Sequence, residues 1–296
     1  MRRYDIDWLR VLALGFLIVY HVVISFQPWA QYIFFIQNDQ SLEWLWIFMG
    51  MINIWRIPIL FMISGMGARF AMERRNWRQF LKDRTVRILI PFIFGLFCIC
   101  PISVYIAMQY SGTEPQYIPN TGHLWFLANI FLYVLFLLPL LTYLKNRSDN
   151  FVLRFLSNMF HRPAGIYLVA LPVMFEAWLV NPESFPGYAQ TSHGFWLGMV
   201  CFLSGFIFVS LKSVFWQAVE GVRRGALAVA FLLYLVRLVI FQLEGEPSVL
   251  TAFESMSWML AFFGFGSLYL NKPSRKLAYF SKAVYPVYIV HMPLQY

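Results

Sequence analysis

The sequence predicts an all-helical protein whose helices cross a membrane many times. Hydrophobic residues make up 60% of the 296-residue chain and charged residues only 12%, whereas about a quarter of the residues in a soluble domain are charged. Apolar runs long enough for membrane helices recur along the whole chain. Lys and Arg gather in alternate connecting segments, which is typical of a multi-pass protein. These three observations predict a polytopic transmembrane helix bundle.

Eight apolar runs have roughly the length of a membrane helix, and a ninth begins at Ala283. We therefore expect about nine spans, arranged as one membrane domain over residues 1–296. The eight runs lie near 8–26, 44–66, 88–106, 124–144, 164–180, 195–211, 226–243 and 251–270.

The distribution of the cations predicts which side of the membrane each connecting segment faces. All but three of the 23 Lys and Arg residues precede the first run or lie in every second connecting segment, and the segments between contain none. The positive-inside rule places the N-terminus and the basic segments in the cytoplasm. This topology explains the net charge of +9, so the bilayer is the expected partner and no nucleic acid is. The three remaining cations, Arg10, Arg56 and Arg237, fall within predicted spans.

The first span carries two ionisable side chains on one face. Arg10 and His21 are eleven residues apart, which on an α-helix leaves them about 20° apart around the axis and about 16 Å apart along it. Ionisable residues in lipid are costly and usually face a cavity or a partner. We therefore expect this face to be the functional axis of the protein.

The second span contains Arg56 followed by Pro58 near its centre, and it ends in small residues that include Gly65. Proline frees a backbone carbonyl and bends a helix, and small residues allow close helix packing. Packing alone explains Pro58 and Gly65 at least as well as a catalytic role does. Arg56 differs because a guanidinium at mid-membrane needs a polar partner.

Two further segments each allow two interpretations. The segment from Arg69 to Arg87 is the most basic of the chain, and it is either a topogenic loop on anionic lipid or a docking surface for a polyanionic cytosolic cofactor. His123 lies at a predicted helix start beside Trp125, and it is either an interfacial anchor or a functional residue.

Buried charges in the later spans share a predicted depth with His21. Glu176, Arg237 and Glu254 all lie in the outer half of the membrane in the assigned topology. Mutual ion pairing explains them as structural residues. Their shared depth also suggests a polar pocket open to the outside.

The final 14 residues, from Ala283 to Tyr296, are too short for a span, which needs about 20 residues. This segment is either re-entrant or the start of a truncated last span, and we expect a truncated one. It contains His291, at about mid-membrane depth if the segment crosses the bilayer.

Motifs of other chemistries are missing from the sequence. It contains no Gly-x-Ser-x-Gly elbow, P-loop, His-Glu-x-x-His pair or dinucleotide fingerprint. Cys98, Cys100 and Cys201 all lie within predicted spans, so we expect neither a disulfide nor a metal site. No internal repeat is evident, which counts weakly against an inverted-repeat transporter.

Five pieces of the sequence, in order along the chain, resemble acyltransferase family 3, a family of polytopic membrane enzymes that modify extracytoplasmic sugars. Within that family the chain is similar to the branch concerned with succinylation of periplasmic glucans. The pieces are 7–10 (DWLR) followed by ten residues and His21, 56–65 (RIPILFMISG), 80–91 (FLKDRTVRILIP), 123–127 (HLWFL) and 285–293 (YPVYIVHMP).

The resemblance implies about ten spans in the inner (plasma) membrane and the transfer of an acetyl or succinyl group. The donor would be cytosolic acyl-CoA, and the acceptor a hydroxyl of an extracytoplasmic glycan or polysaccharide. The functional Arg and His of the family map onto Arg10 and His21, which are the expected catalytic residues. His21 would act either as a general base or as a transient acyl carrier, and Arg10 would bind the CoA phosphates. The expected substrate-binding residues are Asp7, Arg56, Ser64, His123, Trp125, Arg237, Glu254 and His291.

Two other classes of function compete with this prediction. A proton-coupled transporter or flippase for a glycan-type substrate would use the same His and buried charges as a proton relay. A membrane scaffold or receptor would leave the three buried arginines as costly residues without a task.

Overall fold

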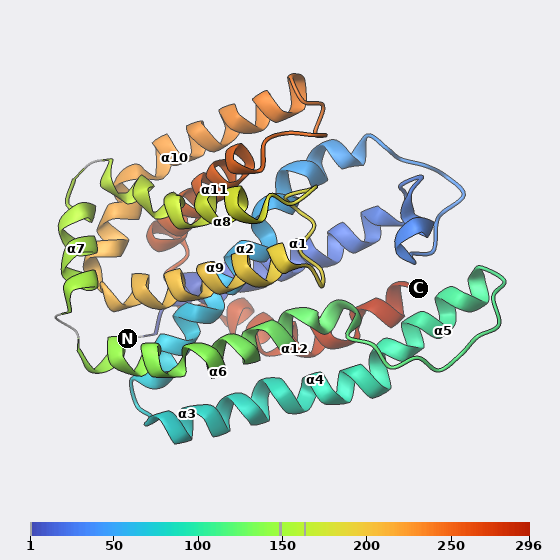
Figure 1. Cartoon of the computed structure of the whole chain (residues 1–296), viewed down its shortest axis with the longest axis horizontal. Helices are drawn as coiled ribbons and strands as arrows, with labels where there is room; N and C mark the ends of the chain where they lie inside the picture. Colours follow the sequence, from blue (N-terminus) through green and yellow to red (C-terminus); the bar gives the residue numbers. More distant parts are fainter. Residues whose placement is uncertain (1, 148–149, 163) are drawn as a thin grey trace.

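The computed structural model describes residues 2–147, 150–162 and 164–296, which form helices and, over these ranges, no strands (Figure 1). Most of the helices run along the long axis of the molecule. The α-helices are α1 (Tyr4–Ile24), α2 (Leu45–Met72), α3 (Trp77–Arg84), α4 (Ile90–Phe94), α5 (Cys100–Tyr110), α6 (Trp125–Asn146), α7 (Phe151–Phe160), α8 (Leu171–Val180), α9 (Ser192–Ser210), α10 (Ser213–Val239), α11 (Ser248–Tyr269) and α12 (Arg275–Gln295). The 3-10 helices are η1 (Ala30–Ile33), η4 (Gly122–Leu124) and η5 (Gly165–Ala170), and the π-helices are η2 (Thr85–Leu89) and η3 (Gly95–Ile99).

Within the residues that the structure describes, six helical segments are long and apolar enough to cross a membrane, which confirms the helical membrane class. They are Tyr4–Ile24, Leu45–Met72, Trp77–Tyr110, Gly122–Asn146, Ser192–Ser210 and Ser248–Tyr269. The other three predicted runs are also helical. They correspond to η5 with α8, to α10 and to α12.

Several helices extend well beyond the predicted runs. The third predicted run, 88–106, lies within one helical segment from Trp77 to Tyr110, whose start is fixed by a capping box between Asn76 and Gln79. The α10 helix begins at Ser213 although its predicted run begins at 226. Its first turns bury Phe215 and Trp216 against the bundle, so packing maintains a helix where the apolar pattern is interrupted.

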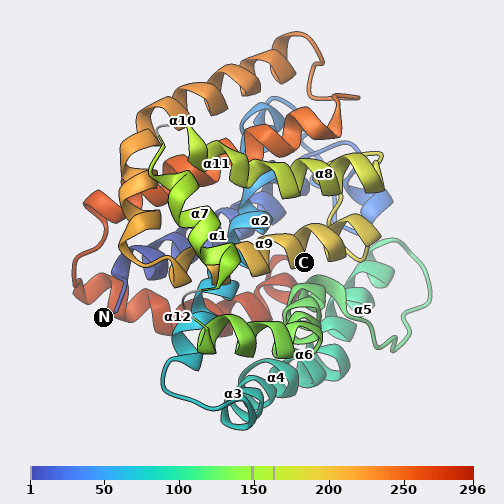
Figure 2. The same ribbon diagram turned by 60° about the vertical axis from the view of Figure 1, so that its left-hand side comes forward.

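Helix α2 lies at the centre of the bundle and is buried along most of its length. It packs against α1, α6, α9 and α11 (Figure 2). Its closest approach is to α9, because a Cβ atom at Gly65 would lie 1.8 Å from the Phe202 carbonyl oxygen and one at Gly205 would lie 1.9 Å from that of Met62. The small residues of α2 therefore serve close helix packing, as in other membrane bundles.

Prolines within the helices create attachment points for distant segments. A proline nitrogen has no hydrogen, so the carbonyl four residues before it loses its usual helical partner. Side chains from elsewhere in the chain bond to the carbonyls freed by Pro58, Pro91, Pro101 and Pro293. The Ile54 oxygen, freed by Pro58, accepts hydrogen bonds from Tyr188 Oη (2.9 Å) and Ser255 Oγ (2.8 Å). The other three carbonyl oxygens accept one each: Arg87 from Tyr285 Oη (2.7 Å), Phe97 from Tyr117 Oη (2.8 Å) and Ile289 from His123 Nε2 (3.0 Å).

Candidate active site

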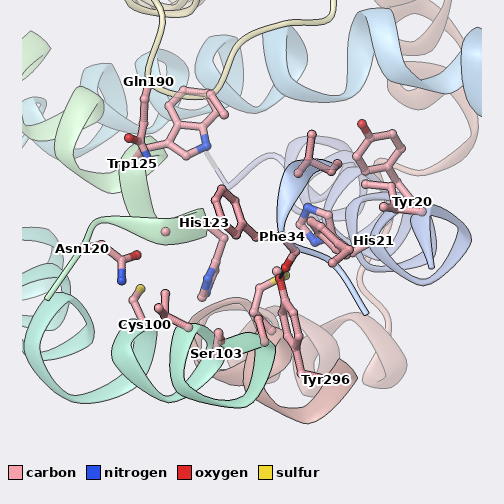
Figure 3. A pocket seen from close by; sticks show the side chains of 18 of the residues that line it. Tyr20, His21, Phe34, Cys100, Ser103, Asn120, His123, Trp125, Gln190 and Tyr296 are labelled. Atoms are coloured by element: carbon pink, nitrogen blue, oxygen red, sulfur yellow. Dashed lines mark hydrogen bonds between the residues drawn. The ribbon is translucent and has the colours of Figure 1, made fainter. Parts of the chain in front are cut away.

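A cavity of about 1330 Å³ opens near one end of the bundle (Figure 3). Its walls come from α1, α2, α5 and α12, from η4 with the start of α6, and from residues 31–36 and 186–191 of two connecting segments. Aromatic side chains form much of the wall, with a few polar groups between them, as is usual for small-molecule sites. Of the predicted site residues, the cavity lining includes His21, Arg56, His123 and Trp125.

His21 projects from α1 into this cavity and is hydrogen-bonded to His291 of α12. The His21 Nδ1 and His291 Nε2 atoms are 2.9 Å apart, and the two rings stack with centroids 5.1 Å apart and planes inclined by 9°. His291 is buried, with 4% of its surface exposed. The two histidines, 270 residues apart in the sequence, therefore form one unit.

The partners of His291 assign the protons of this pair. Its Nδ1 lies 2.8 Å from the Tyr288 carbonyl oxygen, which can only accept, so Nδ1 carries a hydrogen. In the neutral ring Nε2 is then an acceptor, and the shared hydrogen belongs to Nδ1 of His21. Nε2 of neutral His21 consequently has a lone pair, and within the described residues it makes no hydrogen bond. His21 can therefore accept a proton from a molecule in the cavity.

His123 completes a three-histidine cluster from a tight turn at the start of α6. Gly122 forms this turn with a φ of +43°, and a Cβ there would lie 3.0 Å from the Cys100 sulfur, so only glycine fits. His123 Nε2 donates to the Ile289 oxygen, and Tyr288 Oη donates to the His123 carbonyl oxygen (2.6 Å). The His123 ring meets the His291 ring edge to face, with centroids 4.8 Å apart. The cluster thereby links α12 to η4.

Arg56 lines the cavity from α2 and is almost fully buried. Its Nε and Nη2 atoms donate to the Asn53 side-chain oxygen at 3.1 and 2.7 Å. Its guanidinium carbon lies 3.6 Å from the centre of the Tyr20 ring, a cation–π contact. The predicted polar partner of Arg56 is thus an amide and an aromatic face.

Arg10 and Asp7 lie outside the cavity lining, nearer the start of α1. Arg10 Nη2 donates to Asp7 Oδ1 at 3.1 Å, and the second oxygen of Asp7 accepts from Arg2 at 2.8 Å. The Arg10 Nε atom is buried, and within the described part of the chain it has no hydrogen-bond partner. The residues that line the cavity on α1 run from Leu17 to Ile24.

The other predicted site residues are not part of the cavity. Arg237 and Glu254 bind each other within the bundle, with Nε and Oε2 2.5 Å apart. Glu176 pairs with His193, whose Nδ1 lies 3.0 Å from Glu176 Oε1. Ser64 donates to the Leu60 carbonyl of its own helix at 2.8 Å. The structure therefore does not bring the buried charges into one shared pocket, because each acid has its own cationic or imidazole partner.

Sequence reasoning missed residues of the cavity wall and one residue behind it. Tyr20 and Asn53 contact Arg56, and Tyr188 forms part of the wall. Tyr20 precedes His21, and Asn53 lies one helical turn before Arg56, so a search for polar neighbours at helical spacing finds both. Tyr188 gives no such signal, because it reaches α2 from a connecting segment.

The comparisons with known proteins show the family of the chain. The sequence model of acyltransferase family 3, described as an acyltransferase domain, matches residues 3–296. The chain belongs to this family and is a multi-pass membrane O-acyltransferase. The comparisons contain nothing that supports a transporter.

The chain is also similar to individual members of the family. It is 24% identical to the glucans biosynthesis protein C of Salmonella paratyphi B, over 99% of this chain and 82% of that protein. It is 23% identical to the glucans biosynthesis protein C of Escherichia coli, with the same coverage of both chains. No solved structure matches the chain.

Proposed function

We propose that this enzyme transfers an acetyl or succinyl group from cytosolic acyl-CoA to a hydroxyl of an extracytoplasmic glycan. The observation that carries the proposal is the free Nε2 atom of His21 in a large, mostly apolar cavity, with its proton state assigned by His291. The relatives named for glucan biosynthesis support a glycan acceptor.

His21 acts as the general base in the simpler of two routes. The acceptor hydroxyl gives its proton to His21 Nε2 while its oxygen forms a bond to the thioester carbonyl carbon. The carbon–sulfur bond then breaks, and the CoA thiolate takes the proton back from His21. In the second route Nε2 itself attacks the carbonyl carbon and the carbon–sulfur bond breaks to release the CoA thiolate. The hydroxyl oxygen then displaces the acyl group from Nε2, and the hydroxyl proton neutralises the thiolate. Both routes need the same free nitrogen.

The two substrates approach from opposite sides of the inner membrane. The distribution of the basic segments supports a cytoplasmic N-terminus, in a proposed bundle of nine to ten spans. In this topology Arg10 lies near the cytoplasmic face, where its guanidinium binds the phosphates of CoA. The cavity around His21 then faces the outside, where the glycan enters.

The first test is the reaction itself, with purified protein in detergent. We expect acyl-labelled acetyl-CoA or succinyl-CoA to yield a labelled glucan and one free CoA thiol for each acyl group transferred. Mass spectrometry identifies an ester by a mass increase that mild base removes. A protein that releases no thiol and labels no glycan with either donor would contradict the proposed function.

A further inference from the structure

Arg56 is a buried cation that lines the cavity and has an unused hydrogen-bond donor. Only 4% of its surface is exposed. Nε and Nη2 share the oxygen of Asn53, and the buried Nη1 has no hydrogen-bond partner among the residues that the structure describes. Both neighbours, the Asn53 amide and the Tyr20 ring, are uncharged. The guanidinium therefore lacks a counter-charge among its contacts.

The lining of the cavity provides no counter-charge either. Among the described residues that line it there is no Asp or Glu, and Arg56 is the one Arg or Lys. A single buried cation without an anion is costly unless a charged ligand pairs with it.

Arg237 shows how the same fold treats an arginine with a structural task. Its Nε bonds Glu254, its Nη1 bonds Glu246 at 2.8 Å, and its Nη2 bonds the Gly50 carbonyl at 2.8 Å. All three nitrogens are used, and two carboxylates balance the charge. Arg56 has neither a partner for every nitrogen nor a carboxylate to balance its charge, so the stability of the bundle alone does not explain it.

We propose that the unused donor of Arg56 binds a carboxylate of a substrate in the cavity. Guanidinium and carboxylate match in charge and geometry, and such charge-assisted hydrogen bonds are stronger than neutral ones. The carboxylate belongs either to the far end of a dicarboxylic acyl group or to an acidic sugar of the acceptor. Tyr20, which contacts Arg56, directly precedes His21, so the anion site and the reacting nitrogen share one cavity.

This inference rests on the proposed function for its two ligand sources, but its first test measures binding without turnover. We use the thermal unfolding of the purified protein at constant ionic strength, with succinate and its neutral counterpart succinamide, and with glucuronate and its neutral counterpart glucose. A carboxylate ligand raises the Tm of the wild type and its neutral counterpart does not. Stabilisation by succinate assigns the site to the acyl group, and stabilisation by glucuronate assigns it to the acceptor. Equal effects of acids and neutral counterparts would overturn the proposal.

Two variants locate the binding. Arg56→Gln removes the charge, and the shift of Tm caused by the carboxylate should disappear. Arg162→Gln removes an exposed arginine outside the cavity and should respond as the wild type does. A carboxylate-dependent shift of Tm that persists in Arg56→Gln would also overturn the proposal. If Arg56→Gln does not fold, the comparison of acid and neutral ligands on the wild type still decides.

Turnover separates this inference from the proposed function. If the acyl group bears the carboxylate, Arg56→Gln lowers transfer from succinyl-CoA about tenfold or more relative to transfer from butyryl-CoA, which lacks the acid. If the acceptor bears it, the same loss appears between an acidic and a neutral glycan. A wild type that transfers acyl groups and a variant with both ratios unchanged would reject the carboxylate site alone. A wild type without any transfer would reject the proposed function instead.

Discussion

The two ends of α1 carry the two residues that share its predicted functional face, but their surroundings differ. Arg10 pairs with Asp7, a carboxylate of the protein that also binds Arg2. His21 faces a cavity of about 1330 Å³ and keeps its Nε2 atom unbonded within the described residues. One end is thus occupied by the protein's own side chains, and the other is open to a ligand.

This difference separates two roles that the sequence pattern cannot distinguish. A residue prepared for proton transfer needs a fixed tautomer and a free nitrogen, which His291 gives to His21. A residue that binds a phosphate needs only charge and access, and the role proposed for Arg10 requires that a phosphate compete with Asp7. We therefore expect substitutions of Arg10 and of His21 to change different kinetic parameters.

The largest effect should come from His21→Ala. The loss of the general base should lower kcat by about 10²- to 10⁴-fold, because proton transfer contributes that much in other enzymes. His161→Ala, which changes an exposed histidine outside the cavity, is the matched control and should leave kcat unchanged. Acyl transfer from labelled CoA measures both. Wild-type turnover in His21→Ala would remove His21 from the mechanism.

His291→Leu should lower kcat by about 10- to 100-fold, a smaller effect that is typical of residues that orient a catalytic ligand. Leucine cannot accept the hydrogen of His21 Nδ1, so the tautomer and the ring orientation are no longer fixed. His291→Gln retains an acceptor and should recover most of the activity. If His291 had only a structural role, the two variants would not differ in kcat while sharing the same KM. Equal kcat values in His291→Leu and His291→Gln would contradict the positioning role.

Arg10→Ala should raise the KM for acyl-CoA about tenfold and change kcat little, since one charged hydrogen bond to a phosphate is lost. Dephospho-CoA thioesters test the contact directly, because the loss should shrink for a donor that lacks the contacted phosphate. An unchanged donor KM would show that Arg10 serves only the ion pair with Asp7.

The smallest effect should come from Tyr188→Phe. It removes the hydrogen bond to the Ile54 carbonyl that Pro58 leaves free, and such bonds are worth about 0.6 kcal/mol on average in membrane proteins. Chemical unfolding measures the loss. In a Pro58→Ala background Tyr188→Phe should cost less, because the helix then supplies a backbone partner. If Tyr188→Phe lowers the stability of the Pro58→Ala protein as much as that of the wild type, the contribution of Tyr188 does not depend on the proline.

Much of this fold could be predicted from the sequence because bilayer helices leave long apolar runs. All nine predicted runs are helical. Helix ends could not be predicted as well, because α10 continues into polar sequence where Trp216 packs against the bundle. An apolar pattern shows which residues are buried in lipid. It does not show where a helix packs on other helices outside the lipid.

The site could be predicted in part. Helical geometry identified the face of His21, and the cost of a buried charge identified Arg56. The His21–His291 bond could not be predicted from the residues, because it joins helices at opposite ends of the chain. The position of Arg237 outside the cavity could not be predicted either, because the depth of a residue in the membrane does not determine its position around the bundle.

We propose that acyl-CoA approaches α1 from the cytoplasmic side, where Arg10 lies, and that the glycan reaches His21 from the outside. Reconstitution in sealed, oriented vesicles tests it most directly, with acyl-labelled CoA inside and glucan outside. We predict labelled glucan outside and free CoA retained inside. Acylation that requires both substrates on the same side of the membrane would contradict the account.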